Sequence, residues 1–382
     1  MTRVDRPAWA DVDLGAIAHN VGELKRFAGR ALLCVVVKAD GYGHGAVEVS
    51  RAALDAGADA LAVAMVSEGL ELRDAGIDAP VLVLSETPAD ALDLLDLLVG
   101  NRLEPTVYSP SGIAALVSAA ERIRPPEPVA CHLKIDTGMH RVGAAPADAV
   151  VLAAAIGDAA DLTLASVWTH CAVADEPANP FTAVQLSRFA EIMADLDAAG
   201  IRPPLLHAAN SATALAHPGG RLDMVRCGIA VYGIAPFAAA RRLADLRPAL
   251  SLSARVSFVK TVAAGERLSY GLRYCCERDS VIATVPIGYA DGVRRRLSTV
   301  GGEVLIGGRR RPIAGTVTMD QILVDCGDDS DVRIGDEVVL IGAQGQERIT
   351  AEDWAARLDT IGYEIVCGIG PRVQRRYDRE QR

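Results

Sequence analysis

The sequence predicts an α/β protein with an N-terminal (β/α)8 TIM-type barrel and a C-terminal, mostly β domain. Three observations support this prediction. The chain has 382 residues, which is long enough for a barrel and a further domain. From about residue 30 to 235, short apolar runs alternate about eight times with amphipathic stretches. Beyond residue 240, apolar and polar residues alternate with period two, which is typical of half-buried strands.

The candidate barrel strands are apolar runs of similar length. They are ALLCVVV (31–37), ALAVAMV (60–66), VLVL (81–84), LEPTVY (103–108), CHLKI (131–135), LTLASVW (162–168), PLLHA (204–208) and LDMVRCGIAVY (222–232). Helix-like segments such as VEVSRAALDAG separate them, and several of these end in glycine, as helices commonly do. A doubly wound sheet shows the same alternation, but eight units favour a barrel.

The second domain begins with LSLSARVSFVKTV (250–262) and continues as strand-and-turn units with glycines at the turns. These units are SVIATVPIGYADG, GEVLIGGRR, PIAGTVTMDQILVDC and GDEVVLIG, and one short helix is expected near AEDWAARL. We therefore expect residues 1–240 to form the barrel and residues 241–382 to form the β domain. The first ten or so residues are expected to pair with the second domain.

Composition narrows the function classes. A net charge of −10 argues against a nucleic-acid partner. Two arginine triplets, 294–296 and 309–311, are local exceptions that favour solvated faces or a small anionic ligand. The longest apolar run, 149–156, is too short to cross a membrane, and the N-terminus lacks the apolar core of a secretory signal. Eight scattered cysteines without a CxxC pair predict reduced thiols, a cytoplasmic protein and no metal site.

The stretch VVVKADGYGHG (35–45) places Lys38 at the end of a buried strand, before a glycine-rich turn. Such a lysine can simply extend its amine to the surface. Desolvation near other cations would instead make it a nucleophile able to form a Schiff base. Barrel enzymes place their chemistry at the C-terminal ends of the strands. Other polar residues of this sequence fall at those predicted ends: Lys134, Asp136, His170, Asn210, Ser211 and Arg226.

A phosphate-bearing Schiff-base cofactor would need an anion cradle. The run NSA places Asn210 and Ser211 where a helix can begin, and free backbone amides at a helix start bind phosphate. Gly228 and Ile229 follow the last predicted barrel strand, near which TIM barrels usually bind phosphate. Taken alone, NSA can be only a helix cap and Gly228 only a turn.

Nine motifs in chain order resemble those of bacterial alanine racemases, which depend on pyridoxal 5′-phosphate (PLP). They are VVVKADGYGHG, LKIDTGMHRVG, THCAVAD, HAANSA, VRCGIAVYG, GERLSYG, PIGYADG, TVTMDQ and IGYEIVC, and the resemblance runs from about residue 8 to 377. It implies a PLP-dependent isomerase that interconverts L-alanine and D-alanine for peptidoglycan. It also implies a head-to-tail homodimer with shared active sites.

The resemblance assigns roles to the polar residues. Lys38 would bind PLP through a Schiff base and act as one proton-transfer base. Tyr270 would be the second base, reaching in from the partner subunit, with His170 and Arg226 behind it in a hydrogen-bond chain. Arg226 would also face the pyridine nitrogen of PLP. The residues that would hold the phosphate are Tyr42, Ser211, Gly228, Ile229 and Tyr363.

By the same resemblance, Arg141 would bind the substrate carboxylate, helped by the backbone N–H of Met319. Tyr289 would narrow the entrance. Lys134 matches a lysine that is carbamylated in many members, where the added negative charge steadies the arginine.

Two residues depart from the pattern. Thr316 stands where the family usually has arginine, and Thr318 stands where it often has cysteine. Thr316 leaves open a related racemase of broader range, for example on serine. A PLP-dependent decarboxylase of the same architecture and a non-catalytic PLP-binding protein are also compatible with a Schiff-base lysine. The motifs SYG, GYADG and MDQ are those of racemases and disfavour the decarboxylase. A non-catalytic PLP-binding protein would usually lack the second domain and would have no use for Tyr270.

Overall fold

The computed structural model describes residues 7–378, which divide into two compact units. The barrel unit comprises Ile17–Gly41 and Ala46–Arg247. The β unit comprises the described residues up to Ala16, the short stretch Tyr42–Gly45, and the described residues from Pro248 onward. Each unit is described below by itself.

The barrel unit contains eight parallel strands in consecutive order, with β9 beside β2. They are β2 (Leu32–Val36), β3 (Ala60–Val63), β4 (Val81–Val83), β5 (Glu104–Val107), β6 (Val129–Lys134), β7 (Leu162–Trp168), β8 (Leu205–His207) and β9 (Met224–Cys227). The gap between β8 and β9 is bridged by backbone bonds, including Arg226 N–H to the Ala209 carbonyl at 2.9 Å. The predicted (β/α)8 barrel is therefore confirmed.

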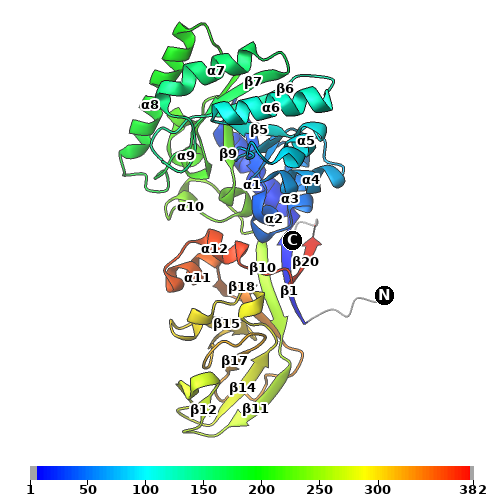
Figure 1. Cartoon of the computed structure of the whole chain (residues 1–382). Coiled ribbons are helices and arrows are strands. Elements are labelled where there is room, and N and C mark those ends of the chain that lie inside the picture. Colours follow the sequence, from blue (N-terminus) through cyan, green and yellow to red (C-terminus); the bar gives the residue numbers. More distant parts are fainter. Residues whose placement is uncertain (1–6, 379–382) are drawn as a thin grey trace. The chain divides into compact units, whose positions relative to one another are not determined.

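Helices pack around these strands (Figure 1). They are α1 (Leu14–Ala28), α3 (Ala46–Asp55), α4 (Val66–Asp74), α5 (Leu92–Gly100), α6 (Pro110–Ile123), α7 (Ala149–Asp158), α8 (Phe181–Ala198), α9 (Ser211–Ala216) and α10 (Ala240–Leu243). Helix α6 shows why the sequence forms them. Ser109 caps it by accepting from Gly112 N–H at 2.9 Å, and Pro110 occupies the first turn. Its buried residues recur at helical spacing and form one face: Ile113, Leu116, Ala119 and Ala120.

Two predicted strands end well before the sequence pattern does. The run 60–66 ends as a strand at Val63, and α4 begins at Val66. The run 222–232 forms β9 and then a 3₁₀ helix, Ile229–Tyr232. Val66 at the start of α4 and the 3₁₀ helix Ile229–Tyr232 are as buried as the strands before them, so hydrophobicity alone does not mark where the strand stops.

The β unit is built on a seven-stranded sheet in the order β16–β15–β18–β10–β1–β20, with β19 paired to β18. The strands are β1 (Ala8–Asp13), β10 (Leu250–Arg255), β15 (Glu303–Ile306), β16 (Arg309–Pro312), β18 (Glu337–Gln344), β19 (Glu347–Ile349) and β20 (Gln374–Asp378). Strand β1 is antiparallel to β10 and parallel to β20. Residues 1–6 of the N-terminal segment expected to pair here lie outside the described residues.

Smaller elements complete the β unit. A three-stranded sheet joins β11 (Phe258–Val262), β14 (Ser280–Val285) and β17 (Ile322–Asp325), and a two-stranded ladder joins β12 (Arg267–Leu268) and β13 (Tyr274–Cys275). Helices α11 (Ala351–Leu358) and α12 (Gly362–Cys367) follow the sheets. The mostly β character predicted for this domain is confirmed.

Candidate active site

Lys38 lies two residues beyond strand β2 and begins a left-handed helical turn, α2 (Lys38–Gly43). Residues 39–43 all have positive φ, from +52° to +78°. Ala39, Asp40 and Tyr42 carry side chains, and each disfavours this region by about 1–2 kcal/mol. The sequence indicated a glycine-rich turn here but not its left-handed geometry. Strained backbone of this kind is commonly found at functional sites.

Neighbouring groups of the barrel unit hold the strained turn in place. The carboxylate of Glu68 accepts from Ala39 N–H at 2.7 Å, and the carboxylate of Asp40 accepts from Ala46 N–H at 2.9 Å. Gly41 N–H donates to the Val37 carbonyl at 2.8 Å. The backbone on both sides of Lys38 is therefore fixed, and so is the origin of its side chain.

Two buried cations, Lys134 and Arg226, contact one indole ring. Lys134 Nζ lies 4.4 Å from the ring centroid of Trp168, and the Arg226 guanidinium lies 4.5 Å from it. Burial, followed by the positive charges of Arg226 and Arg141, lowers the pKa of Lys134 to about 7. Burial also lowers the pKa of Arg226, to about 10. At neutral pH, Arg226 therefore stays charged, whereas a large share of Lys134 is neutral.

His170 contacts Arg226 and is neutral. Its Nδ1 lies 3.3 Å from Nη2 of Arg226, which also donates to the Thr169 carbonyl at 2.8 Å. Burial, followed by the charge of Arg226, holds the pKa of His170 well below its usual value. Because the guanidinium can only donate, Nδ1 of His170 accepts and its proton resides on Nε2. His170 thus presents a donor on the side away from Arg226.

Arg226 is also one end of a hydrogen-bond chain through five adjacent barrel strands. Arg226 Nη1 lies 2.7 Å from His207 Nδ1, and His207 Nε2 lies 2.7 Å from Ser166 Oγ. Ser166 Oγ lies 2.6 Å from His132 Nδ1, and His132 Nε2 lies 3.0 Å from Glu104 Oε2. A donor-only guanidinium at one end and a carboxylate at the other fix the direction of every bond. Both imidazoles therefore carry their proton on Nε2.

The predicted anion-binding residues gather where helix α9 follows strand β8. Ser211 is the first residue of α9, and Gly228 N–H donates to its hydroxyl at 3.0 Å. Ile229 begins a 3₁₀ helix, so its N–H has no carbonyl partner within that helix. Asn210 caps α9 by accepting from Thr213 N–H at 2.9 Å. The side chain of Asn210 therefore positions the helix start, Ser211 and Ile229 offer a hydroxyl and an amide, and Gly228 N–H orients the hydroxyl.

Arg141 is an exposed residue of the barrel unit, and the other predicted residues lie in the β unit. The rings of Tyr42 and Tyr363 are neighbours, with centroids 6.0 Å apart. Tyr289 N–H donates to the Thr318 carbonyl at 3.0 Å, which ties the loop of Tyr289 to that of Met319. Tyr270 starts the 3₁₀ helix Tyr270–Leu272, and the residue is 73% exposed in the chain.

Models of two protein domains match this chain over most of its length. The model described as alanine racemase, N-terminal domain, covers residues 12–236, and that of the alanine racemase C-terminal domain covers 249–377. The chain belongs to the alanine racemase family. It is therefore a PLP-dependent enzyme that interconverts L-alanine and D-alanine.

Relatives and solved structures of the same family cover nearly all of the chain. The alanine racemase of Symbiobacterium thermophilum is 48% identical, over 98% of this chain and 98% of its own. The alanine racemase of Thermobifida fusca is 45% identical, over 97% of this chain and 98% of its own. The alanine racemase structure from Streptomyces coelicolor A3(2) superposes with a TM-score of 0.92 at 39% identity, covering 98% of both chains.

The residues present fit the cofactor of this family. PLP carries a dianionic phosphate, and the Ser211 hydroxyl with the amide of Ile229 supplies neutral donors at helix starts, while Gly228 N–H orients that hydroxyl by donating to it. The pyridine nitrogen of PLP can accept a hydrogen bond, and Arg226 is a buried donor that keeps its charge at neutral pH. Lys38 stands at the C-terminal end of the barrel strands with its backbone fixed.

Sequence reasoning did not anticipate Glu104, His132, Ser166 or His207 in the network behind Arg226. A signal was present, because CHLKI and PLLHA each place a histidine inside an otherwise buried strand. A buried imidazole needs hydrogen-bond partners. Its partners come from strands that are separated by 34 and 41 residues in the chain, so sequence spacing does not identify them.

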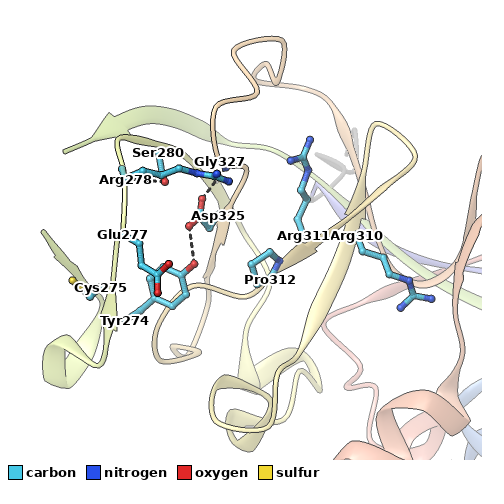
Figure 2. A pocket seen from close by; sticks show the side chains of 10 residues that line it. All are labelled: Tyr274, Cys275, Glu277, Arg278, Ser280, Arg310, Arg311, Pro312, Asp325 and Gly327. Carbon is cyan, nitrogen blue, oxygen red and sulfur yellow. Dashed lines mark hydrogen bonds between the residues drawn. The ribbon is translucent and has the colours of Figure 1, made fainter. Parts of the chain in front are cut away.

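A separate pocket of about 470 Å³ lies in the β unit (Figure 2). Its lining residues are Tyr274, Cys275, Glu277, Arg278, Ser280, Arg310, Arg311, Pro312, Asp325 and Gly327. Tyr274 donates to Asp325 at 2.6 Å, and burial together with that bond raises the pKa of Tyr274. None of the predicted site residues lines this pocket, so it is distinct from the candidate active site.

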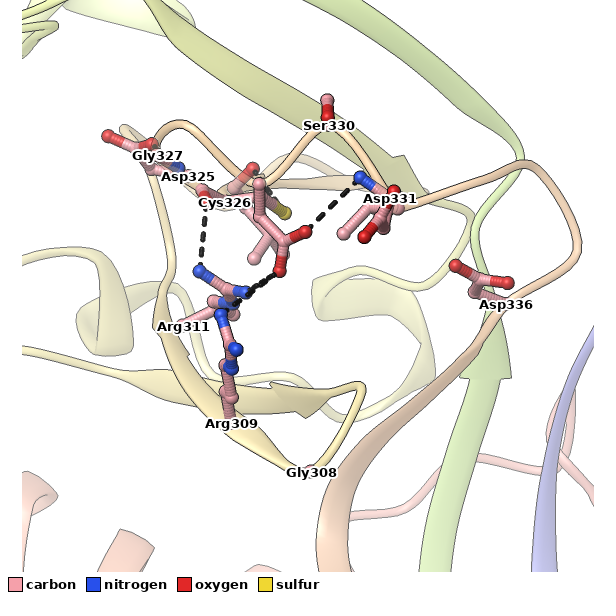
Figure 3. A network of polar contacts seen from close by, with 12 residues as sticks. Gly308, Arg309, Arg311, Asp325, Cys326, Gly327, Ser330, Asp331 and Asp336 are labelled. Carbon is pink, nitrogen blue, oxygen red and sulfur yellow. Dashed lines mark hydrogen bonds and ion pairs between the residues drawn. The ribbon is translucent and has the colours of Figure 1, made fainter.

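The arginine triplet 309–311 binds carboxylates of its own chain. Arg311 donates to the Cys326 carbonyl at 2.8 Å (Figure 3). Arg311 also forms an ion pair with Asp329, and Arg309 lies 3.5 Å from that carboxylate. Arg310 donates to Glu347 at 2.7 Å. Of the two sequence interpretations, these ion pairs favour a role in the folded surface over a ligand site.

Proposed function

We propose that the buried cation cluster of the barrel unit is where alanine is racemised. The observation that carries this proposal is that Arg226 contacts a neutral histidine and shares the Trp168 ring with a lysine of lowered pKa, while the charge of Lys38 acts on both His170 and Lys134. PLP, when bound, withdraws electrons from the substrate α-carbon and so acidifies its α-proton. Lys38 would hold the cofactor, and Ser211, Gly228, Ile229, Tyr42 and Tyr363 would bind its phosphate.

Racemisation needs a base on each face of the α-carbon, and we assign these roles to Lys38 and Tyr270. A tyrosine has an ordinary pKa near 10, so it must be stabilised as a phenolate to act near neutrality. His170 supports this assignment, because its Nε2 proton is free of Arg226 and can be donated to a phenolate. The charged Arg226 behind His170 favours the same state.

The substrate carboxylate requires a cation, and we assign that role to Arg141, helped by Met319 N–H. Arg141 is exposed in the chain, and its positive charge contributes to the lowered pKa of both Lys134 and His170. Tyr289 would restrict the size of the substrate side chain. Its backbone bond to Thr318 places it beside Met319 within the β unit.

We infer that the active enzyme is a homodimer in which each subunit supplies Tyr270 to its partner's site. Four large side chains of the β unit support this, because they are strongly exposed in the single chain: Tyr270, Leu272, Tyr289 and Met319. Isolated exposed apolar groups are common on protein surfaces, but here they lie on loops that the family motifs mark as functional.

A cytoplasmic location and a supply of D-alanine for peptidoglycan complete the proposal. Cys34, Cys131 and Cys227 are buried free thiols, as expected in a reducing compartment. Among the described residues, no helix combines the length and apolar character needed to cross a bilayer.

The first experiment incubates the purified protein with PLP and L-alanine in D₂O and follows chirality and α-deuterium together. D-alanine that carries α-deuterium is the expected product. Lys38→Ala should abolish it together with covalent attachment of the cofactor. Release of CO₂ would indicate a decarboxylase, and turnover of serine in place of alanine would indicate the broader racemase that Thr316 leaves open. No turnover of any amino acid would overturn the proposal.

A further inference from the structure

The loop that carries Tyr270 has a strained backbone. Ser269 has φ +61° and ψ −175°, a combination otherwise found almost only at glycine. Gly271 and Leu272 also have positive φ, +76° and +49°. Such a conformation persists only where surrounding contacts enforce it.

Two reciprocal hydrogen bonds hold the Tyr270 loop in this conformation. The Thr316 hydroxyl donates to the Tyr270 carbonyl at 2.7 Å, and the Ser269 hydroxyl donates to the Thr316 carbonyl at 2.7 Å. Thr316 is only 5% exposed, so its hydroxyl has little access to water as an alternative partner. The preceding Gly315 allows the close approach, because a Cβ at that position would lie 2.8 Å from Cβ of Ser269.

The segment that holds the Tyr270 loop is itself anchored. Val317 N–H donates to the Ser298 hydroxyl at 2.7 Å. Further along, the Thr318 and Met319 carbonyls accept from the N–H groups of Tyr289 and Ala290, both at 3.0 Å. The Tyr270 loop is thus fastened to the same segment that carries Met319 and holds the Tyr289 loop.

We propose that Ser269 and Thr316 form a clamp that positions Tyr270 for proton transfer. This inference rests on the proposed role of Tyr270 as the second base. Tyr270 is 73% exposed in the chain, and the contacts that hold it within this unit are those of its backbone. A displacement of about 1 Å at a catalytic group can cost about 100-fold in rate. Thr316 is therefore a positioning residue that acts through the Tyr270 carbonyl.

The test uses the PLP-loaded enzyme with α-deuterated L-alanine and D-alanine, supplied separately in H₂O. Overall rates in the two directions are tied together by the equilibrium constant, so they do not reveal which base is impaired. Loss of α-deuterium with retention of configuration does reveal it. When one base fails, the other removes the deuteron and returns a proton on the same face.

For Thr316→Val, we expect the ratio of retention to inversion to rise about tenfold for one enantiomer only, as expected when a positioning hydrogen bond is lost. Tyr270→Phe should shift the ratio for the same enantiomer, and more strongly. Thr316→Ser keeps the hydroxyl and should stay near the parent. Ser269→Ala removes the other arm of the clamp and should repeat the effect of Thr316→Val.

Thr299→Val is the matched control, since that hydroxyl also donates to a backbone carbonyl, Arg296 O at 2.9 Å, within its own turn. It should leave both ratios unchanged. Unchanged ratios in Thr316→Val and Ser269→Ala, or equal losses for both enantiomers, would overturn the clamp if Tyr270→Phe still shifts its ratio. If Tyr270→Phe shifts nothing, the proposed base and the clamp both fail.

Discussion

Lys134 and Arg226 respond differently to burial beside Trp168. Removing a cation from water is costly, and a group can avoid the cost by losing its proton. An ammonium does so readily, and the pKa of Lys134 falls to about 7. A guanidinium resists, and the pKa of Arg226 falls only to about 10. One environment thus yields an amine that is partly neutral and a cation that is permanent near neutrality.

This difference predicts that Lys134 takes up CO₂. A neutral amine attacks CO₂, forms an N–C bond and releases one proton, which leaves a carbamate with one negative charge. Lys134 is neutral above about pH 7 and charged below it, so the carbamate should form above that pH and disappear as the pH falls. The measurement is ¹³C NMR of the enzyme equilibrated with ¹³C-bicarbonate at several pH values.

Lys134→Gln should lack the carbamate resonance. Lys260→Gln is the control and should keep the resonance, because Lys260 is an exposed lysine of strand β11. A resonance that persists in Lys134→Gln, or that grows as the pH falls below 7, would contradict the assignment.

At the scale of elements, the left-handed turn α2 is the least expected feature of the molecule. Its residues are connected to regular structure on both sides, by β2 before it and α3 after it. Gly43 permits a close approach within the β unit, since a Cβ there would lie 2.4 Å from the Val366 carbonyl oxygen. Arg375 also donates to the Gly43 carbonyl at 3.0 Å.

Gly43→Ala should therefore destabilise the protein by about 2–4 kcal/mol, from backbone strain and the clash with Val366 together. Gly29→Ala is the matched control. Gly29 has a similar φ of +67° but nothing within 4 Å of a Cβ, so it should lose only about 1 kcal/mol. Urea unfolding of the parent and both variants measures the difference. Equal losses would show that crowding at Gly43 contributes nothing.

At the scale of the whole barrel, the chain from Arg226 to Glu104 joins β9, β8, β7, β6 and β5. It requires His207 to remain neutral, and burial followed by the charge of Arg226 holds its pKa well below the usual value of 6.5. The same holds for His170. In mild acid, His170 and His207 therefore stay neutral in the folded barrel, whereas the unfolded chain would bind a proton at each.

This predicts how stability depends on pH. Below about pH 6.5 the unfolded chain binds protons at His170 and His207 and the folded chain does not. The contribution of the two neutral histidines to the free energy of unfolding is complete above that pH. It falls as the pH drops, by up to about 1.4 kcal/mol per pH unit for each histidine. Urea unfolding between about pH 8 and about pH 5 should show this loss.

His207→Gln keeps an acceptor for Arg226 and a donor for Ser166 but does not titrate. The slope of its unfolding free energy against pH should therefore be smaller than that of the parent, by the amount that corresponds to about one proton. His140→Gln supplies the comparison, because it removes a histidine whose side chain is 79% exposed. Parallel curves for His207→Gln and the parent would contradict the assignment of a neutral buried His207.

The amino-acid sequence by itself determined the two-domain class, the barrel alternation and the residues at its strand ends. These features depend on side-chain periodicity and local turn chemistry, which neighbouring residues fix. The motifs around Lys38, Tyr270 and Met319 also identified the family. The sequence named Asn210 both as a candidate ligand and as a cap, and the structure gives its side chain the contacts of a cap.

Only the tertiary structure decided which polar groups meet. The partners of His132, Ser166 and His207 are set by the register of neighbouring strands, which a single sequence does not encode locally. The left-handed turn after Lys38 exists because Glu68, Asp40 and Val37 hold it against its own steric preference. The bond from Thr316 to Tyr270 joins residues 46 positions apart, and only folding brings them together.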